Sequence, residues 1–272
     1  MINHVVSKDG TSIAYTKIGQ GPALILVDGA LCYRASGPNG PLAELLSPHF
    51  TVYTYDRRGR GDSNEMKPYA IEREVEDIAA LIEAVGESVH VYGISSGAAL
   101  ALEAAKRLPS ITKLVLYEAP FVVETSRPPV PDNYAAKLDE LLAANRRGSA
   151  VKHFMRTGVG LPALVVAMMP LMPAWSKLKA VAHTLPYDTQ LTVDFQKGKP
   201  LVADYWSSVT VPALVVYGSK SPAWMQNGMQ SLAKVLTQAV GRVLEGESHI
   251  VKPQSLAPLI IDFCKNNSYT EE

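Results

Sequence analysis

The sequence has few cysteines, with only Cys32 and Cys264 among 272 residues. They lie far apart and form no Cys-x-x-Cys pair, and no His, Cys or Asp residues have the spacing of a metal site. The first residues also lack a basic segment followed by a long apolar one. We therefore expect a reduced, cytoplasmic protein that needs neither a metal nor another cofactor.

An excess of charge of either sign is also absent, because 26 Lys and Arg residues balance 26 Asp and Glu residues. The chain has no net field that would attract nucleic acid or a membrane surface. Its most apolar stretch, 161–172, is interrupted by Pro162 and Pro170 and is too short to span a bilayer. We expect neither nucleic acid nor a membrane as a partner. The oligomeric state stays open, a homodimer included.

Apolar runs and helical segments alternate along most of the chain, and 47% apolar content suffices for one core or for one core with an insertion. Strands are predicted at 2–6, 12–17, 23–27, 51–55, 89–92, 113–117, 213–217 and 241–244. Helices are predicted at 41–46, 71–85, 97–108, 230–237 and 256–266. Asp9-Gly10 is a strong turn signal, so the first two strands should form a hairpin at one edge. The alternation of strands and helices after this hairpin predicts an α/β fold with a mostly parallel eight-stranded sheet and helices on both faces.

Strand signals are weak between 121 and 201, where Pro, Met and Ala are frequent. Amphipathic segments occur at 133–145, 149–157, 161–169 and 175–183. We interpret 121–201 as an inserted helical cap over one end of the sheet, and 1–120 together with 202–272 as the core.

The most informative stretch is Gly93-Ile94-Ser95-Ser96-Gly97, which follows an apolar strand and precedes an alanine-rich helix. A strand, sharp turn and helix place Ser95 at the apex, and the two glycines let neighbouring chain pass without a Cβ clash. The Ser96 N–H would then point at an anion forming beside Ser95. The pattern predicts a nucleophile with one oxyanion donor.

A second oxyanion donor is expected from the strand 23–27. The carboxyl ends of parallel strands share one rim of the sheet, where ligands bind in open α/β folds. Asp28-Gly29-Ala30 follows this strand, so the N–H of Gly29 or Ala30 is the candidate.

A serine nucleophile needs a base, and the base needs an acceptor for its second nitrogen. His249 lies between the last strand and the last helix, which favours it over the other five histidines. The loop 218–222, which follows the strand 213–217 at this rim, holds no carboxylate. We therefore assign the acid to Glu118, which ends the adjacent strand 113–117. Asp204 is the alternative, although it precedes its strand and should lie at the opposite edge.

Several other residues are candidates for an apolar substrate pocket, and ordinary core packing explains any one of them equally well. They are Leu31, Met168, Met172, Trp175, Tyr187 and Trp224. Gly59-Arg60-Gly61 lacks the Lys-Ser/Thr ending of a phosphate-binding loop. The neighbouring Asp56, Arg57 and Asp62 are expected to brace a loop behind the site through ion pairs.

Together these motifs resemble the α/β-hydrolase fold superfamily along nearly the whole chain. The resemblance rests on the serine turn 93–97, the loop 55–63 and the histidine loop 246–249. A narrower similarity is to lactonases that open the macrolide ring of zearalenone. Its residues are Asp28-Gly29, Ser95-Ser96-Gly97, Glu118-Ala119-Pro120 and Ser221-Pro222-Ala223. This similarity strengthens Glu118 as the acid.

These observations predict a serine hydrolase of carboxylic esters or lactones that forms an acyl-enzyme on a small apolar substrate. A cofactor-free perhydrolase, a carbon–carbon hydrolase or a lyase of the same fold stays open, as does a slow-turnover ligand-binding receptor. Serine in place of aspartate at the turn disfavours haloalkane dehalogenase and epoxide hydrolase chemistry.

Overall fold

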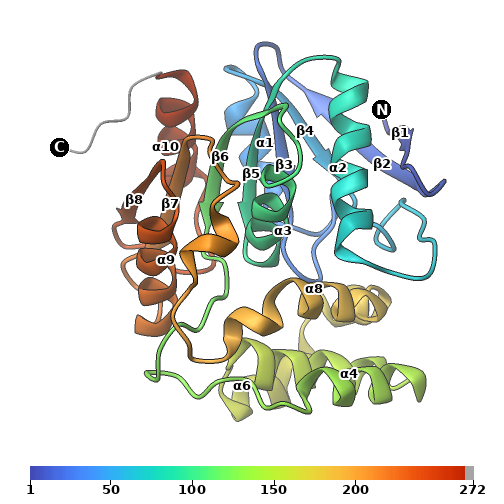
Figure 1. The fold of residues 1–272 in the computed structure, drawn as a ribbon. Coiled ribbons are helices and arrows are strands. Elements are labelled where there is room, and N and C mark those ends of the chain that lie inside the picture. The colour runs from blue at the N-terminus through green and yellow to red at the C-terminus, as the bar shows by residue number, and fades with distance from the viewer. Residues whose placement is uncertain (267–272) are drawn as a thin grey trace.

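The computed structural model describes residues 1–266 and is built around one eight-stranded sheet (Figure 1). Its strands are β1 (Asn3–Val6), β2 (Ser12–Ile18), β3 (Ala23–Val27), β4 (Thr51–Tyr55), β5 (Val89–Ile94), β6 (Ile111–Tyr117), β7 (Ala213–Gly218) and β8 (Ala239–Leu244). They lie in the order β1-β2-β4-β3-β5-β6-β7-β8. β2 runs antiparallel to both neighbours, and the other pairs are parallel. The predicted mostly parallel sheet is confirmed.

Helices cover both faces of the sheet because successive strand residues point to opposite sides. Leu24 and Leu26 of β3 face a core that contains helices α1 (Asn39–Leu46) and α10 (Pro253–Lys265). Ile25 and Val27 face a second core with α2 (Ile71–Val85), α3 (Ser96–Ala105) and α9 (Ala223–Val235). This explains why β3 is an unbroken apolar run in the sequence.

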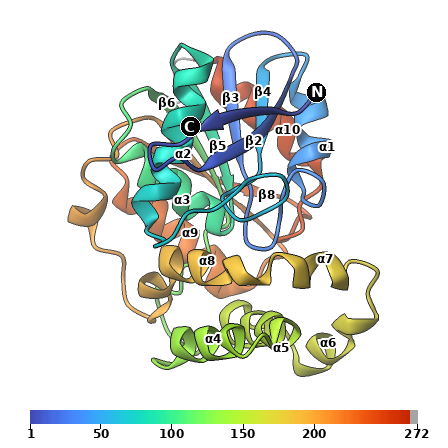
Figure 2. The ribbon, with the colours of Figure 1, turned by 90° about the vertical axis from the view of Figure 1, so that its right-hand side faces the viewer.

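The chain between β6 and β7 forms a helical insertion, which Figures 1 and 2 show as a separate layer beyond one end of the sheet. Its helices are α4 (Tyr134–Ala143), α5 (Arg147–His153), α6 (Ala163–Met168), α7 (Trp175–Ala180) and α8 (Leu185–Thr192), with a π-helical turn at Phe154–Val159 and short 3-10 turns between. They pack around an apolar cluster of their own, which Leu31 of the core joins.

Two helices differ most from the prediction, while α1, α3 and α10 differ from it by one to three residues at their ends. Helix α8 was not predicted, because its buried residues include Asp188, Thr189 and Thr192 and therefore form no apolar stripe. Helix α9 begins at Ala223, directly after Pro222, rather than at the predicted residue 230. Helix signals that depend on apolar periodicity fail where a helix buries polar residues.

Within residues 1–266 no helix is long and apolar enough to cross a bilayer. In the same range no three His, Cys, Asp or Glu side chains are grouped so that they could hold a metal ion. Cys32 and Cys264 are both free thiols.

Gly228 tests the packing of α9 on the chain that leaves β6. A Cβ added to Gly228 would lie 2.3 Å from the carbonyl oxygen of Phe121. Alanine usually stabilises a helix interior relative to glycine, but this clash should dominate. We expect Gly228→Ala to lower the free energy of unfolding by about 1–3 kcal/mol in urea denaturation. In the control Gly241→Ala the nearest atom is Ala233 Cβ at 3.5 Å, and equal destabilisation by both changes would contradict the packing described.

Candidate active site

Ser95 lies at the sharp turn between β5 and α3, as predicted. Its φ of 58° and ψ of −127° are strained for a residue with a Cβ. Two close approaches make the turn feasible only with glycine: a Cβ on Gly93 would lie 2.4 Å from the Gly97 carbonyl oxygen, and a Cβ on Gly97 would lie 2.4 Å from that of Val27. The strain presents the Ser95 side chain at the rim of the sheet, where it stays partly exposed.

The loop after β3 passes directly beside Ser95. A Cβ on Gly29 would lie 3.0 Å from Ser95 Cβ and 3.6 Å from Ser95 Oγ, so the backbone of Gly29 and Ala30 runs next to the serine. Ser96 is the first residue of α3, and its N–H therefore has no acceptor within the helix. The structure thus brings Gly29 and Ser96, two of the residues predicted to carry oxyanion donors, beside the predicted nucleophile.

Glu118 and His249 form a direct contact. Nδ1 of His249 lies 2.8 Å from Oε2 of Glu118, whose side chain is fully buried. Oε1 of Glu118 accepts hydrogen bonds from the Gly218 N–H at 2.8 Å and from the Ser221 hydroxyl at 2.5 Å. These three partners fix the carboxylate and turn Nε2 of the imidazole away from it.

The two donors at the end of β7 and in the loop after it were not predicted from the sequence, where residues 218–222 stand out only for lacking a carboxylate. Ser221 is buried, and its hydroxyl serves the carboxylate that the neighbouring strand provides. The one available signal was that β6 and β7 would be neighbours in the sheet.

The loop that carries His249 is anchored to the same two strands. The Tyr117 hydroxyl donates to the Ser248 carbonyl at 2.7 Å, and the Lys220 N–H donates to the Glu247 carbonyl at 2.8 Å. Gly218 approaches so closely that a Cβ there would lie 2.3 Å from the Glu247 carbonyl oxygen. The His249 ring is 38% exposed and lies at the surface of this anchored loop.

Asp204, the alternative acid, lies on the 3-10 turn Ala203–Trp206 before β7 and is exposed. Within residues 1–266, the carboxylate that pairs with His249 is that of Glu118.

A buried ion-pair network lies behind the serine turn. Oδ1 of Asp188, on α8, accepts from Arg57 Nη1 and from the Ser96 hydroxyl, both at 2.7 Å, and its Oδ2 accepts from Arg60 at 2.7 Å. Arg57 also binds Glu74 of α2 through two nitrogens at 2.6 and 2.7 Å. The expected bracing role of Arg57 is confirmed, whereas Asp188 was not predicted.

The two other bracing residues behave as expected. Asp56 and Asp62 both bind the Arg34 guanidinium, at 3.0 and 2.7 Å, and Asp56 also accepts from the Arg34 N–H at 2.7 Å. They hold the end of the loop that follows β3.

The six pocket candidates do not share one environment. Leu31 and Trp175 belong to the apolar cluster of the insertion, while Met168 and Met172 are 55% and 49% exposed. Tyr187 stacks on Tyr69 with ring centroids 3.9 Å apart, and Trp224 packs against the Arg127 guanidinium at 4.5 Å.

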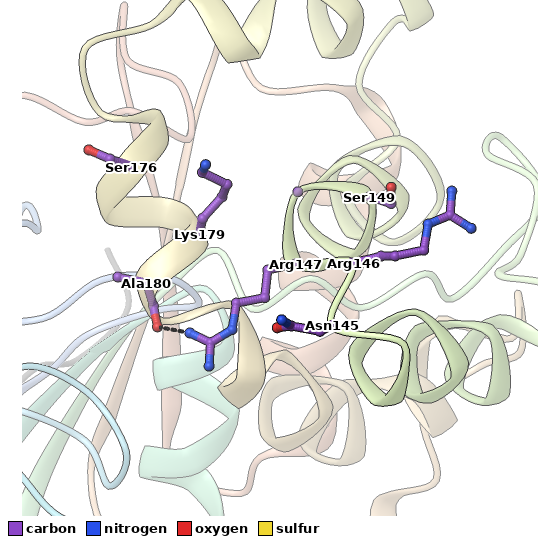
Figure 3. A pocket seen from close by; sticks show the side chains of 8 residues that line it. Asn145, Arg146, Arg147, Ser149, Ser176, Lys179 and Ala180 are labelled. Carbon is purple, nitrogen blue, oxygen red and sulfur yellow. Dashed lines mark hydrogen bonds between the residues drawn. The ribbon is translucent and has the colours of Figure 1, made fainter.

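A hollow of about 610 Å³ lies on the insertion between the α4–α5 turn and α7 (Figure 3). Its charged lining consists of Arg146, Arg147 and Lys179, and Arg147 donates to the Ala180 carbonyl at 2.9 Å. None of the six pocket candidates lines this hollow.

Asp28 is the one carboxyl of the loop after β3, and it is almost completely buried, with no hydrogen-bond partner for Oδ1 among the described residues. Burial raises the pKa of Asp28 to about 7, and the guanidinium groups of Arg60 and Arg57 oppose this only in part. The folded protein therefore holds a proton here that the unfolded chain has already released near pH 4.

This proton links stability to pH. Because the pKa of Asp28 is raised on folding, its contribution to stability is present below about pH 4 and is lost as the pH rises to about 7. We expect Asp28→Asn to raise the free energy of unfolding, relative to the wild type, by roughly 2 kcal/mol more at pH 8 than at pH 5. As a control, the pKa of Asp9 is lowered to about 2, so Asp9→Asn should change the free energy of unfolding by the same amount at pH 5 and at pH 8. Equal effects of Asp28→Asn at pH 5 and pH 8 would contradict the assignment.

Comparison with known proteins identifies the family of the chain. The sequence model of the Alpha/beta hydrolase family matches residues 24–257. A pimeloyl-acyl carrier protein methyl ester esterase of Xylella fastidiosa is 33% identical over 147 residues, which are 48% of this chain and 55% of that protein. The uncharacterized hydrolase YraK of Bacillus subtilis is 29% identical over 126 residues, 45% of this chain and 46% of its own. The chain spans about half the length of these curated relatives.

Solved structures match over nearly the whole chain. An alpha/beta hydrolase from Sphaerobacter thermophilus is 47% identical with a TM-score of 0.90, and the match covers 96% of this chain and 100% of that one. An enol-lactonase from Burkholderia xenovorans has a TM-score of 0.70 at 21% identity, covers 97% and 100% of the two chains, and shows the shared fold. With its parallel sheet and strained serine turn, the chain belongs to the alpha/beta hydrolase family.

Proposed function

We propose that the protein is a serine hydrolase of carboxylic esters or lactones, with Ser95 as nucleophile, His249 as base and Glu118 as acid. The observation that carries the proposal is the 2.8 Å contact between Glu118 and His249 at the same rim as the strained Ser95. A nucleophile at an exposed turn and a base oriented by a buried carboxylate are the parts that acyl transfer requires.

In this mechanism Ser95 Oγ attacks the carbonyl carbon while Nε2 of His249 takes the hydroxyl proton. The resulting oxyanion accepts hydrogen bonds from the Ser96 N–H and from that of Gly29 or Ala30. His249 then returns the proton to the leaving alkoxide, and the acyl-enzyme remains. A water molecule, deprotonated by His249, attacks the acyl-enzyme and restores Ser95. In a lactone the leaving alkoxide is part of the acyl chain, so the first step opens the ring and the second step releases a single hydroxy acid.

The register of the sheet supports Glu118 as the acid. Ile94 of β5 pairs with Tyr117 of β6, so the residues that follow them, Ser95 and Glu118, leave neighbouring strands side by side. The Ser95 N–H donates to the Tyr117 carbonyl at 2.9 Å and ties the two strand ends together. Through its Nδ1–H, His249 can bind the carboxylate and keep Nε2 unprotonated for the attack step.

The substrate class rests on the relatives and on the position of the insertion. The names of a methyl ester esterase and an enol-lactonase among the related proteins fit cleavage of a carboxylic ester bond. We propose that residues 121–201 act as a cap, since Leu31 of the loop beside Ser95 packs in the apolar cluster of the insertion. A small apolar ester or lactone is the expected substrate, without a cofactor in the reaction.

The nucleophile can be tested by covalent labelling. A fluorophosphonate probe should add to Ser95, as located by peptide mass spectrometry, and Ser95→Ala should abolish both labelling and turnover of esters, lactones and thioesters of graded acyl size. A serine hydroxyl activated by a base is the group that such probes phosphonylate. Unchanged ester turnover by folded Ser95→Ala would refute the proposal.

The acid can be tested separately by steady-state kinetics. Glu118→Gln should lower kcat by about 10³ to 10⁴-fold, because an amide no longer fixes the tautomer or stabilises the imidazolium. Circular dichroism should show an intact fold. The control is Asp204→Asn, which should retain wild-type kcat. The reverse result, with a loss only in Asp204→Asn, would transfer the acid role to Asp204.

A further inference from the structure

One side chain of the insertion reaches the serine turn. Asp188 lies on α8, 92 residues after Ser96 in the chain, and its carboxylate is 1% exposed. It accepts hydrogen bonds from the Ser96 hydroxyl, Arg57 and Arg60, each at 2.7 Å. The carboxylate thus contacts the residue whose N–H is the first proposed oxyanion donor.

The same two arginines hold the loop that carries the second donor. Arg60 Nη1 donates to the Gly29 carbonyl at 2.7 Å and to the Cys32 carbonyl at 3.2 Å. Arg57 Nη1 donates to the Asp28 carbonyl at 3.3 Å. The loop after β3 is therefore fixed from behind by the guanidinium groups that Asp188 binds.

Because a peptide group is planar, a hydrogen bond that fixes a carbonyl also fixes the direction of the N–H of the next residue. In a trans peptide the C=O and the following N–H point in opposite directions. The Gly29 carbonyl that faces Arg60 therefore turns the Ala30 N–H away from Arg60, and the Asp28 carbonyl that faces Arg57 does the same for the Gly29 N–H. Gly29 also lies against Ser95, so the two arginines fix the orientation of peptide groups that run beside the nucleophile.

The network keeps its charge although it is buried. Burial would raise the pKa of Asp188, but the guanidinium groups of Arg60 and Arg57 and the Ser96 hydroxyl outweigh it, so the pKa lies below its ordinary value. Two arginines face two carboxylates, those of Asp188 and Glu74. A buried ion pair of this kind often adds little net stability compared with apolar packing. We therefore ask how these ion pairs orient the residues that they contact.

We propose that Asp188 is a positioning residue for the oxyanion hole, and that it couples the seating of the insertion on the core to the orientation of both backbone donors. This inference rests on the proposed serine hydrolase function. Asp188 does not touch the substrate; it acts through Ser96, Arg57 and Arg60.

The test is Asp188→Asn, which keeps the shape of the side chain and removes its charge. We expect kcat for an ester to fall roughly 10- to 100-fold while KM changes less than about threefold, because the oxyanion donors act mainly in the transition state. The affinity for a trifluoromethyl ketone, whose adduct with serine carries an oxyanion, should fall in parallel with kcat/KM. A role in stability alone would change neither kcat nor this affinity in folded enzyme.

The matched control is Asp77→Asn. Asp77, on α2, binds Arg58, which lies between Arg57 and Arg60 in the loop after β4, through two hydrogen bonds of 2.7 and 2.8 Å. Its side chain is as buried as that of Asp188. In the described hydrogen bonds it contacts neither Ser96 nor the loop after β3. Both variants should lower the thermal midpoint, since each leaves a buried arginine partly unpaired. Only Asp188→Asn should lose kcat and ketone affinity.

Ser96→Ala keeps the proposal testable if Asp188→Asn does not fold. It removes the hydroxyl that donates to Asp188 and leaves the Ser96 N–H and both ion pairs in place. We expect a smaller loss of kcat, about 3- to 10-fold, with the same parallel loss of ketone affinity. Wild-type kcat in Ser96→Ala, or a folded Asp188→Asn that behaves like Asp77→Asn, overturns the positioning role. A wild-type protein that hydrolyses no ester would instead overturn the proposed function.

Discussion

The close approach between the serine turn and the end of β3 is the constraint on which the site depends. Gly97 lies so near the backbone of Val27 and Asp28 that any side chain there would collide with their carbonyl oxygens. The approach is available because β3 and β5 are parallel neighbours, so their carboxyl ends meet at one rim. At this turn Ser95 has a positive φ of 58°, and Gly29 of the loop after β3 lies beside it. The proposed nucleophile and the residues that carry the proposed oxyanion donors thus lie at one backbone contact.

The remaining parts of the site come from the other side of β5. Glu118 follows β6, the last residue of β7 and the loop after it each provide one donor to its carboxylate, and the loop after β8 provides His249. Two neighbouring strands therefore contribute to the acid: Glu118 follows β6, and Gly218 and Ser221, at the end of β7 and in the loop after it, donate hydrogen bonds to its carboxylate. Behind the turn, Asp188 joins the insertion to the same rim through Arg57 and Arg60. The core and the insertion therefore meet through buried ion pairs beside the serine turn, and not only at an apolar surface.

Much of this could be predicted from the sequence, and the failures share a physical cause. The strands β3 and β4 and the helix α2 have the predicted bounds, because their apolar runs and periodic stripes are local signals. The order of Ser95, Glu118 and His249 along the rim follows from alternation of strands and helices. Helix α8 and the roles of Asp188 and Ser221 could not be predicted, because a buried polar residue looks like a surface residue until its distant partner is known. The lining of a substrate pocket could not be predicted either, since side-chain packing decides whether a methionine lines a cavity or lies on the surface.

The most direct test of the account is a crystal structure of the protein after reaction with a phosphonate ester. We expect phosphorus bonded to Ser95 Oγ, with one phosphoryl oxygen accepting hydrogen bonds from the Ser96 N–H and from the N–H of Gly29 or Ala30. His249 should then lie between the adduct and Glu118. An adduct on another residue, or a phosphoryl oxygen that points away from both backbone segments, would contradict it.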